Sequence, residues 1–371
     1  MKLQNIAYTL PDGPVVIVRL PGIREPGAGN TALFAAARTI TATRAFVAGP
    51  GATATALWAA RAGAAVTYWT ENAAEGQSLA SSFAQNHIPV ARSFVQADFA
   101  GLEPATCEEA FIHLPRGKVL QEEALRLAAA MLRPGGRLVF AGATDEGVRS
   151  ALQQARTVFG QAGIVARKGG FHAGVARRPD GDFPFPPIRR SERDIVVDGA
   201  PARLVSYAGA FAADRLDDGA AVLIAEMQIS DGARVLDLGC GTGLVGLAAL
   251  RRGGHVVLTD VSARAVLSAR ETLAINGYPD IHIAHACGAM TAETATFDIV
   301  VANPPFHQGH GINFEAAKVF IEEAARVLKA GGRLYLVANA FLGYEPWLRA
   351  HFTRVQRVQN DRRFCVWEGV K

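Results

Sequence analysis

The pattern of apolar and polar positions along the chain predicts an α/β fold. Largely apolar runs at 235–238, 255–259 and 298–302 have the length of buried strands, and a stretch of helical composition follows the first of them at 244–250. Strands that alternate with helices form a mostly parallel, doubly wound sheet with helices on both faces. A last strand at 364–368 is expected to run antiparallel to the others.

The same pattern predicts a hairpin and a helix ahead of this core. Two short apolar runs, 195–198 and 203–207, flank Gly199-Ala200-Pro201 and indicate a pair of strands joined by a turn. The apolar residues of 211–227 then recur at helical spacing, so we expect one helix over that stretch.

The order of elements occurs twice in the chain. With a shift of 190 residues, 44–51 lies over 234–241 and 59–63 lies over 249–253. A further unit, 131–138, matches 327–334 with a shift of 196. Three matching units in one order favour an internal duplication over two unrelated α/β domains.

The first copy lacks the polar groups of the second. The replaced residues pair as Asp237 with Val47, Gly243 with Thr53, Asp260 with Thr70, and Asn303 with His113. We therefore expect two doubly wound domains, 1–180 and 181–371, of which the first is degenerate and serves packing or RNA binding.

The connection between the two copies is rich in proline and positive charge. The sequence Phe-Pro-Phe-Pro-Pro at 183–187 predicts a stiff, extended linker, because proline fixes φ and has no amide donor. The basic residues around it either form an ordinary solvated face or attract phosphates. They are Arg167, Lys168, Arg177, Arg178, Arg189, Arg190 and Arg193.

Composition narrows the class of protein. The chain has 371 residues, half of them hydrophobic, and a formal net charge of +4, which suits two domains of ordinary size. No apolar stretch is long enough to cross a bilayer and the first residues do not resemble a signal peptide, so we expect a cytoplasmic protein that binds no membrane. Its cysteines are far apart and predict neither disulfides nor a metal site: Cys107, Cys240, Cys287 and Cys365. Nothing in the sequence reports on oligomeric state, and a monomer is the working expectation.

A glycine-rich turn after the strand at 235–238 predicts a nucleotide cofactor site. Gly239, Gly241 and Gly243 supply a backbone that can approach a ligand closely. Their spacing is GxGxG, which favours a ligand without a pyrophosphate. Asp260 ends the next strand, where an acid typically takes ribose hydroxyls.

The stretch from Asn303 to Phe306, Asn-Pro-Pro-Phe, carries the candidate chemistry. The Asn303 side chain and the Pro304 carbonyl can each accept an N–H from a planar amine. The Phe306 ring can stack on the base that bears this amine, and Pro305 stiffens the turn. Turning the nitrogen lone pair toward a methyl donor in this way is catalysis by positioning. His307 is either a general base or a contact to base or phosphate.

These motifs resemble the class I S-adenosylmethionine-dependent methyltransferases that alkylate amino nitrogens. The longer matches Phe306-His307-Gln308-Gly309, 337–342 and 363–366 resemble the ribosomal small subunit methyltransferase C family, guanine-N2 enzymes of 16S ribosomal RNA. The resemblance covers roughly 190–371 and implies S-adenosylmethionine as cofactor, ribosomal RNA or the small ribosomal subunit as partner, and an inactive first domain.

The resemblance also assigns roles to residues of the second copy. It implies cofactor contacts by Asp237, Gly239, Gly241, Gly243, Asp260 and Cys287, catalysis by Asn303, Pro304, Pro305 and Phe306, and substrate contacts by Phe306, His307, Arg363 and Phe364. One departure is that no acid or amide follows 281–285, so main-chain groups of 286–288 are expected to hold the adenine.

Other functions stay open on the sequence alone. They are guanine-N2 methylation of 23S ribosomal RNA, methylation of protein glutamine or DNA adenine, and a non-catalytic role as an RNA-binding assembly factor. The degenerate first copy and the Phe-His-Gln-Gly extension favour ribosomal RNA over protein or DNA.

Overall fold

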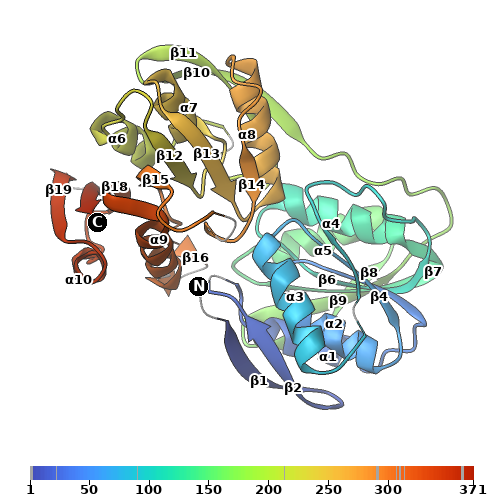
Figure 1. The fold of residues 1–371 in the computed structure, drawn as a ribbon. Coiled ribbons are helices and arrows are strands. Elements are labelled where there is room, and N and C mark those ends of the chain that lie inside the picture. Colours follow the sequence, from blue (N-terminus) through green and yellow to red (C-terminus); the bar gives the residue numbers. More distant parts are fainter. Residues whose placement is uncertain are drawn as a thin grey trace. The chain divides into compact units, whose positions relative to one another are not determined.

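The computed structural model divides between Ile188 and Arg189 into two compact units, each drawn in Figure 1. The sequence had placed the boundary at residue 180, so the proline-rich stretch 183–187 belongs to the first unit. The structure describes every residue except Met1, Lys2, Gly22, Val90, Ala213, Met290, Thr291, Phe306, Gly309, His310, Asn313, Asp361 and Arg362.

The first unit begins with an antiparallel hairpin of β1 (Gln4–Leu10) and β2 (Gly13–Arg19). A seven-stranded sheet follows in the order β5-β4-β3-β6-β7-β9-β8. In this sheet β9 runs antiparallel to both of its neighbours, β7 and β8. Its strands are β3 (Arg44–Ala48), β4 (Ala65–Thr70), β5 (Arg92–Val95), β6 (Cys107–His113), β7 (Leu132–Ala143), β8 (Ala162–Lys168) and β9 (Phe171–Arg177). The helices are α1 (Ala28–Ala37), α2 (Thr53–Arg61), α3 (Ala73–Gln85), α4 (Lys118–Met131) and α5 (Val148–Phe159).

The second unit repeats this plan. A hairpin of β10 (Arg190–Val197) and β11 (Ala200–Tyr207) precedes a sheet in the order β14-β13-β12-β15-β18-β20-β19. Its strands are β12 (Arg234–Leu238), β13 (His255–Asp260), β14 (Ile283–His285), β15 (Phe297–Ala302), β18 (Leu328–Asn339), β19 (Arg354–Asn360) and β20 (Phe364–Val370), with a small ladder of β16 (His307–Gln308) and β17 (Gly311–Ile312). The helices are α6 (Asp218–Glu226), α7 (Leu244–Arg251), α8 (Ala263–Ile275), α9 (Phe314–Val327) and α10 (Glu345–Arg349).

The identical strand order of the two sheets confirms the predicted duplication. Registers agree as well: Asp237 pairs with Leu258 in the second unit, as Val47 pairs with Tyr68 in the first. The last strand, β20, runs antiparallel to β18 as expected. No helix in the described part of the chain is long and apolar enough to span a membrane.

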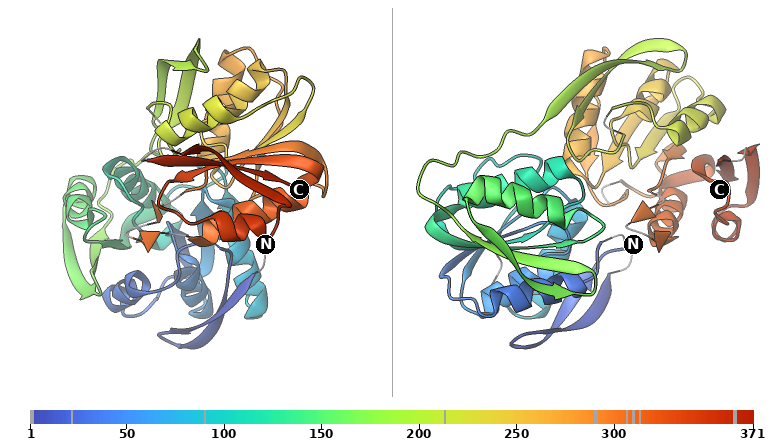
Figure 2. Two further views of the ribbon diagram at one scale, coloured as in Figure 1. Left: turned by 90° about the vertical axis from the view of Figure 1, so that its left-hand side faces the viewer. Right: turned by 180° about the vertical axis from the view of Figure 1, so that it is seen from behind.

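Helices cover both faces of the seven-stranded sheet of the second unit, as the further views in Figure 2 show. Successive residues of a strand point to opposite faces, so Val235 packs with α6, α7 and α8 whereas Leu236 packs with α9 and α10. Both residues are fully buried. Strands buried on both faces explain the continuous apolar runs in the sequence.

The helix expected over 211–227 is shorter than predicted. It begins at Asp218, and the preceding residue Asp217 is its N-cap, with an extended backbone and a side chain that accepts from the Ala220 amide. Ala212 has φ of 51°, a value that a right-handed helix excludes. In the loop before the helix, Leu216 packs against the hydrophobic core whereas Phe211 is exposed, so the apolar spacing there did not mark one buried helical face.

Part of the basic cluster at the linker is committed to internal contacts. Arg178 is buried, donates from Nη2 to the Gly181 carbonyl at 3.0 Å and lies over the Phe183 ring. Arg190 pairs with Glu192 and Glu271. A phosphate-attracting role is therefore wrong for Arg178, because its charge does not face solvent.

In both units a helix holds the hairpin through side chains four residues apart. In the second unit, Ser268 and Thr272 of α8 bind the backbone of β11, and Thr272 Oγ1 both accepts from the Val205 amide at 3.0 Å and donates to its carbonyl at 2.9 Å. In the first unit, Ser82 of α3 makes the same two contacts with Val18 of β2. The duplicated domains thus share a specific polar attachment as well as a topology.

This attachment gives a stability prediction. Replacing Thr272 by Val leaves a buried amide and carbonyl of Val205 without partners, so the free energy of unfolding of the second unit should fall by about 2–4 kcal/mol. Chemical unfolding followed by circular dichroism measures the change. Arg270→Ala on the exposed side of the same helix is the control. Equal stability of the two variants would contradict the proposed role of Thr272.

Candidate functional site

The turn after β12 has a backbone that requires glycine. Gly239, Gly241 and Gly243 have φ of 77°, 56° and 81°, in the left-handed region. Space is also restricted: a Cβ on Gly239 would lie 2.8 Å from the Phe320 ring, and one on Gly243 would lie 3.0 Å from Ala269. The turn therefore needs glycine for conformation and for close packing.

Asp260, at the end of β13, fixes this turn from the side. Its Oδ2 accepts from the Gly241 amide at 2.8 Å, and its Oδ1 accepts from the Ser262 amide at 2.9 Å. The carboxylate is half-buried. Both oxygens of the carboxylate thus hold backbone amides at the turn and at the segment that follows β13.

Asp237 lies beneath the turn and ties it to α7. Its side chain is buried, and Oδ2 accepts from the Gly246 amide at 2.8 Å. Burial, with a smaller contribution from the charge of Asp260, raises the pKa of Asp237 to about 7. The residue borders the pocket described next, but its hydrogen bond holds the start of a helix.

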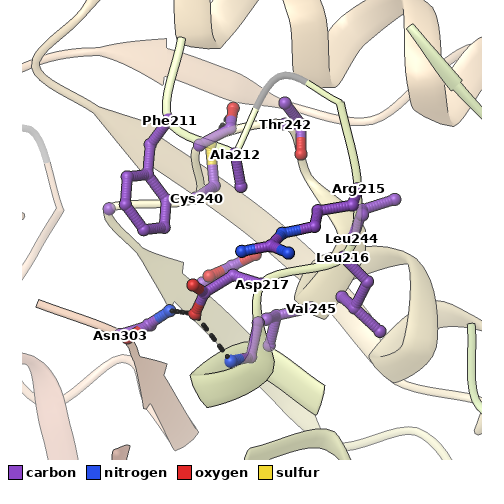
Figure 3. Close-up of a pocket in the computed structure, with 14 residues that line it drawn as sticks. Phe211, Ala212, Arg215, Leu216, Asp217, Cys240, Thr242, Leu244, Val245 and Asn303 are labelled. Carbon is purple, nitrogen blue, oxygen red and sulfur yellow. Dashed lines mark hydrogen bonds between the residues drawn. The ribbon is translucent and has the colours of Figure 1, made fainter. Parts of the chain in front are cut away.

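A pocket opens above the turn, and Asn303 lies at its edge (Figure 3). Asn303 directly follows β15 and donates from Nδ2 to Oδ2 of Asp217 at 3.0 Å. The same Asp217 oxygen accepts from the Ala220 amide at 3.1 Å. The lining residues are Phe211, Ala212, Arg215, Leu216, Asp217, Ala220, Asp237, Gly239, Cys240, Gly241, Thr242, Leu244, Val245 and Asn303.

The structure brings Phe364 to the same place. A Cβ on Gly219 would lie 3.4 Å from the Phe364 ring and 3.5 Å from Oδ1 of Asn303, so both side chains border this glycine. Arg363 forms an ion pair with Asp218 at 2.8 Å and keeps an exposed side chain. Both predicted substrate residues therefore stand beside the first turn of α6.

Other predicted residues are placed only in part. Pro304 is buried and Pro305 is exposed. Phe306 lies outside the described residues, and for His307 only the backbone in β16 is described. Their predicted contacts with a base stay predictions.

Cys287 lies two residues after β14 and is not among the residues that line the pocket. The neighbouring Ala286 amide donates to the Asp260 carbonyl at 2.9 Å, which fixes the segment beside the acid. Cys287 is half-buried, and burial raises the pKa of its thiol to about 11. The group is a neutral thiol at physiological pH, and a contact with a cofactor there stays a prediction.

The equivalent place in the first unit is filled by its own side chains. Oε1 of Glu75 accepts from the Gly51 amide at 3.2 Å, the contact that Asp260 makes with Gly241 in the second unit. His113, which replaces Asn303, lies 2.8 Å from Thr55 Oγ1 through its Nε2. Burial raises the pKa of Glu75 to about 7 and lowers that of His113 to about 3.

Two charged pocket residues were missed by the sequence reasoning. Asp217 was hidden inside a stretch interpreted as one helix, and Arg215 in a loop with no recognised motif. The pair Asp217-Asp218 followed by Gly219 is a signal that could have marked a helix start, because Asp is a favoured N-cap and an acid in the first turn is also favoured.

Comparisons with known proteins agree with this geometry. The model of the family described as Methyltransferase small domain matches residues 201–368. A Ribosomal RNA small subunit methyltransferase C from Stutzerimonas stutzeri is 33% identical over 316 residues, which cover 83% of this chain and 90% of that protein. A protein of the same name from Pseudomonas aeruginosa is 34% identical over 266 residues, covering 70% and 78%.

A solved structure matches the whole chain. It is the T. thermophilus 16S rRNA N2 G1207 methyltransferase in complex with AdoMet and guanosine. The TM-score is 0.86 at 26% identity, and the match covers 99% of this chain and 98% of that chain. Similarity therefore extends over both units.

The raised pKa of Asp237 predicts a pH effect on stability. Between the ordinary value near 4 and the folded value of about 7, the folded state keeps a proton that the unfolded state loses. The free energy of unfolding contributed by this group therefore falls as the pH rises through that window and is constant above it. Asp237→Asn lacks the effect, so its stability relative to wild type should improve from pH 5 to pH 8.

The measurement is chemical unfolding of both proteins, without cofactor, at the two pH values. Comparing the variant with wild type at each pH removes two other contributions to the free energy of unfolding. One is any pH-independent effect of the asparagine substitution, and the other is the effect of groups that titrate equally in both proteins. A difference between variant and wild type that is the same at pH 5 and pH 8 would refute the assignment.

Proposed function

The chain belongs to the ribosomal RNA small subunit methyltransferase C family, and from this premise we propose that its second unit methylates the exocyclic N2 amine of a guanine in 16S ribosomal RNA with S-adenosylmethionine as donor. The observation that carries the proposal is the meeting of the glycine turn, Asp260 and Asn303 at the carboxyl ends of adjacent strands. This meeting supports a cofactor site and an amine-binding site side by side.

The residues of the pocket and the neighbouring Asp260 fit this cofactor. Asp260 presents carboxylate oxygens suited to ribose hydroxyls, and the glycine turn allows close approach of the ligand to the backbone. Arg215 is the basic side chain among the lining residues and suits the carboxylate of the amino-acid moiety. When bound, S-adenosylmethionine supplies an electrophilic methyl group on its sulfonium.

Asn303 would act on the guanine amine. Its Oδ1 and the Pro304 carbonyl each accept one N–H, which turns the nitrogen lone pair toward the methyl group and stabilises the positive charge that develops on the nitrogen. Phe306 would stack on the base, and Phe364 lies close enough to Asn303 to form another wall. The chain needs no strong base at the outset, since the amine loses its proton after it has become cationic.

The target guanine must leave any duplex to reach this pocket. We assign RNA binding to the first unit, residues 1–188, as well. It has 18 basic and 14 acidic residues, a formal charge of +4, whereas 189–371 has 20 of each and no net charge. Positive charge thus resides in the unit that lacks the cofactor site, as expected for a unit that contacts phosphates. A ribosomal RNA substrate also implies a cytoplasmic location and contact with the small subunit.

A decisive test is transfer of labelled methyl from S-adenosylmethionine to unmethylated small and large ribosomal subunits in parallel, with nucleoside digestion afterwards. Label in N2-methylguanosine from the small subunit is expected. Label from the large subunit alone would move the proposal to 23S ribosomal RNA. No label in either would favour a protein or DNA substrate, or a non-catalytic assembly factor.

Asn303→Ala should separate binding from transfer. The turnover number should fall roughly 100-fold or more, because one preorganised acceptor is lost at the reacting amine. Cofactor affinity, measured by calorimetry, should stay within a few-fold of wild type. Gln228→Ala, at an exposed position of the second unit, is the control. A wild-type turnover number for Asn303→Ala would contradict the positioning mechanism.

Asp260→Asn should have the opposite profile. The amide loses the negative charge and one of the two acceptor oxygens, so the dissociation constant of S-adenosylmethionine should rise by about 10- to 100-fold. Turnover at saturating cofactor should change much less than in Asn303→Ala. An unchanged dissociation constant would remove Asp260 from the cofactor site.

A further inference from the structure

The contact between Asp217 and Asn303 joins two elements that are 86 residues apart in the sequence. Asp217 precedes α6 and Asn303 follows β15. Figure 3 shows the Asp217 carboxylate between the Asn303 side chain and the first turn of α6, with one oxygen accepting from both. No role for Asp217 follows from the cofactor or the substrate, so the contact needs its own explanation.

The chemistry of the two side chains fixes the orientation of the amide. An asparagine side chain has a donor end and an acceptor end of nearly the same shape, and rotation by half a turn exchanges them. An ionised carboxylate only accepts hydrogen bonds. Asp217 therefore holds the NH2 end of Asn303, and Oδ1 is left on the other side. In the described part of the chain, no group donates to this Oδ1.

Asp217 is itself held in place. Its carboxylate caps α6 by accepting from the Ala220 amide, and the positive end of the helix dipole stabilises the charge. The helix is anchored by Leu223 and Ile224, which are buried in the core. The orientation of Asn303 is thus set by a group that the fold holds rigidly.

Gly219 leaves the space that this arrangement needs. A Cβ there would lie 3.0 Å from Oδ2 of Asp217 and 3.5 Å from Oδ1 of Asn303. The glycine lies in α6 and its backbone is not in the left-handed region. The missing side chain therefore leaves room for the Asp217–Asn303 pair. The helix itself does not require glycine here, because alanine favours a helix more than glycine does.

We propose that Asp217 is a positioning residue for methyl transfer, which fixes the Asn303 amide so that Oδ1, and never the NH2 group, faces the target amine. This inference rests on the proposed function. A reversed amide would direct its own N–H donors at the N–H donors of guanine. The target amine would then lose one of the two acceptors that orient its lone pair. Asp217 acts through Asn303 and need not touch the substrate.

The first test uses Asp217→Ser. Serine keeps the helix cap but is too short to hold Asn303 in the same way. The turnover number at saturating cofactor should fall by about 10- to 100-fold, as expected when a reacting group is misoriented. The dissociation constant of S-adenosylmethionine and the unfolding midpoint should stay near wild type. Asp280→Ser, at an exposed loop position, is the matched control.

A reciprocal exchange gives a readout that helix capping cannot mimic. In Asn303→Asp two carboxylates would stand about 3 Å apart and repel each other, so turnover should be low. Adding Asp217→Asn removes one of the two charges and supplies an NH2 group that can donate to the carboxylate at position 303. Because Oδ2 of Asp217 accepts from both Asn303 and the Ala220 amide, the introduced asparagine must turn so that its Oδ1 accepts from that amide while its NH2 faces position 303. One oxygen of the carboxylate at position 303 is then left facing the amine. The double variant should be at least severalfold more active than Asn303→Asp alone. Asn and Asp cap helices equally well, so a capping role predicts no such rescue.

Gly219→Ala supplies a second, independent variant. Its turnover should fall while its thermal stability is unchanged or higher, because alanine favours the helix but crowds the pair. Loss of both turnover and thermal stability would indicate that Gly219 is needed only for the fold.

The results distinguish the inference from the proposed function. Wild-type turnover by Asp217→Ser, or absence of rescue in the exchange, overturns the role of Asp217 and leaves the methyltransferase function intact. A defect of Asp217→Ser confined to cofactor affinity also overturns it, because it would make Asp217 a cofactor ligand. If the wild-type protein labels neither ribosomal subunit, the proposed function itself fails.

Discussion

The parallel pairing of β12 with strands on both sides is the constraint on which the rest of the second unit depends. Leu238, the last residue of β12, pairs with Thr259 of β13 and with Ala302 of β15. The residues that follow these three, Gly239, Asp260 and Asn303, therefore leave the sheet at one level. Because the carboxyl ends of parallel strands share an edge, strand pairing alone brings groups that are far apart in the sequence close together.

The first unit shows that this constraint is not sufficient for a cofactor site. It has the same strand order and the same attachment of hairpin to helix. At the sheet edge, however, Glu75 reaches from α3 to bind the Gly51 amide and Thr70, and His113 pairs with Thr55. These buried polar groups satisfy one another, so their acceptors are occupied by contacts within the first unit.

The corresponding edge of the second unit differs in the contacts that its two carboxylates make. Asp260 accepts from the amides of Gly241 and Ser262, and Asp217 accepts from the Ala220 amide and from Nδ2 of Asn303. In each case one carboxylate serves both the backbone of the fold and the geometry of the site. Catalysis by positioning requires this combination, because an amide that rotates freely cannot guide a lone pair.

The sequence by itself determined the fold class, the duplication and the residues at the strand ends. Those features depend on local signals: apolar runs of strand length, glycines where the backbone has positive φ, and a repeated order of units. It did not determine where α6 begins, the burial of Arg178, or the role of Asp217, which depend on partners far away in the chain. Asp217 contacts Asn303 across 86 residues, and only the tertiary structure could bring those two side chains together.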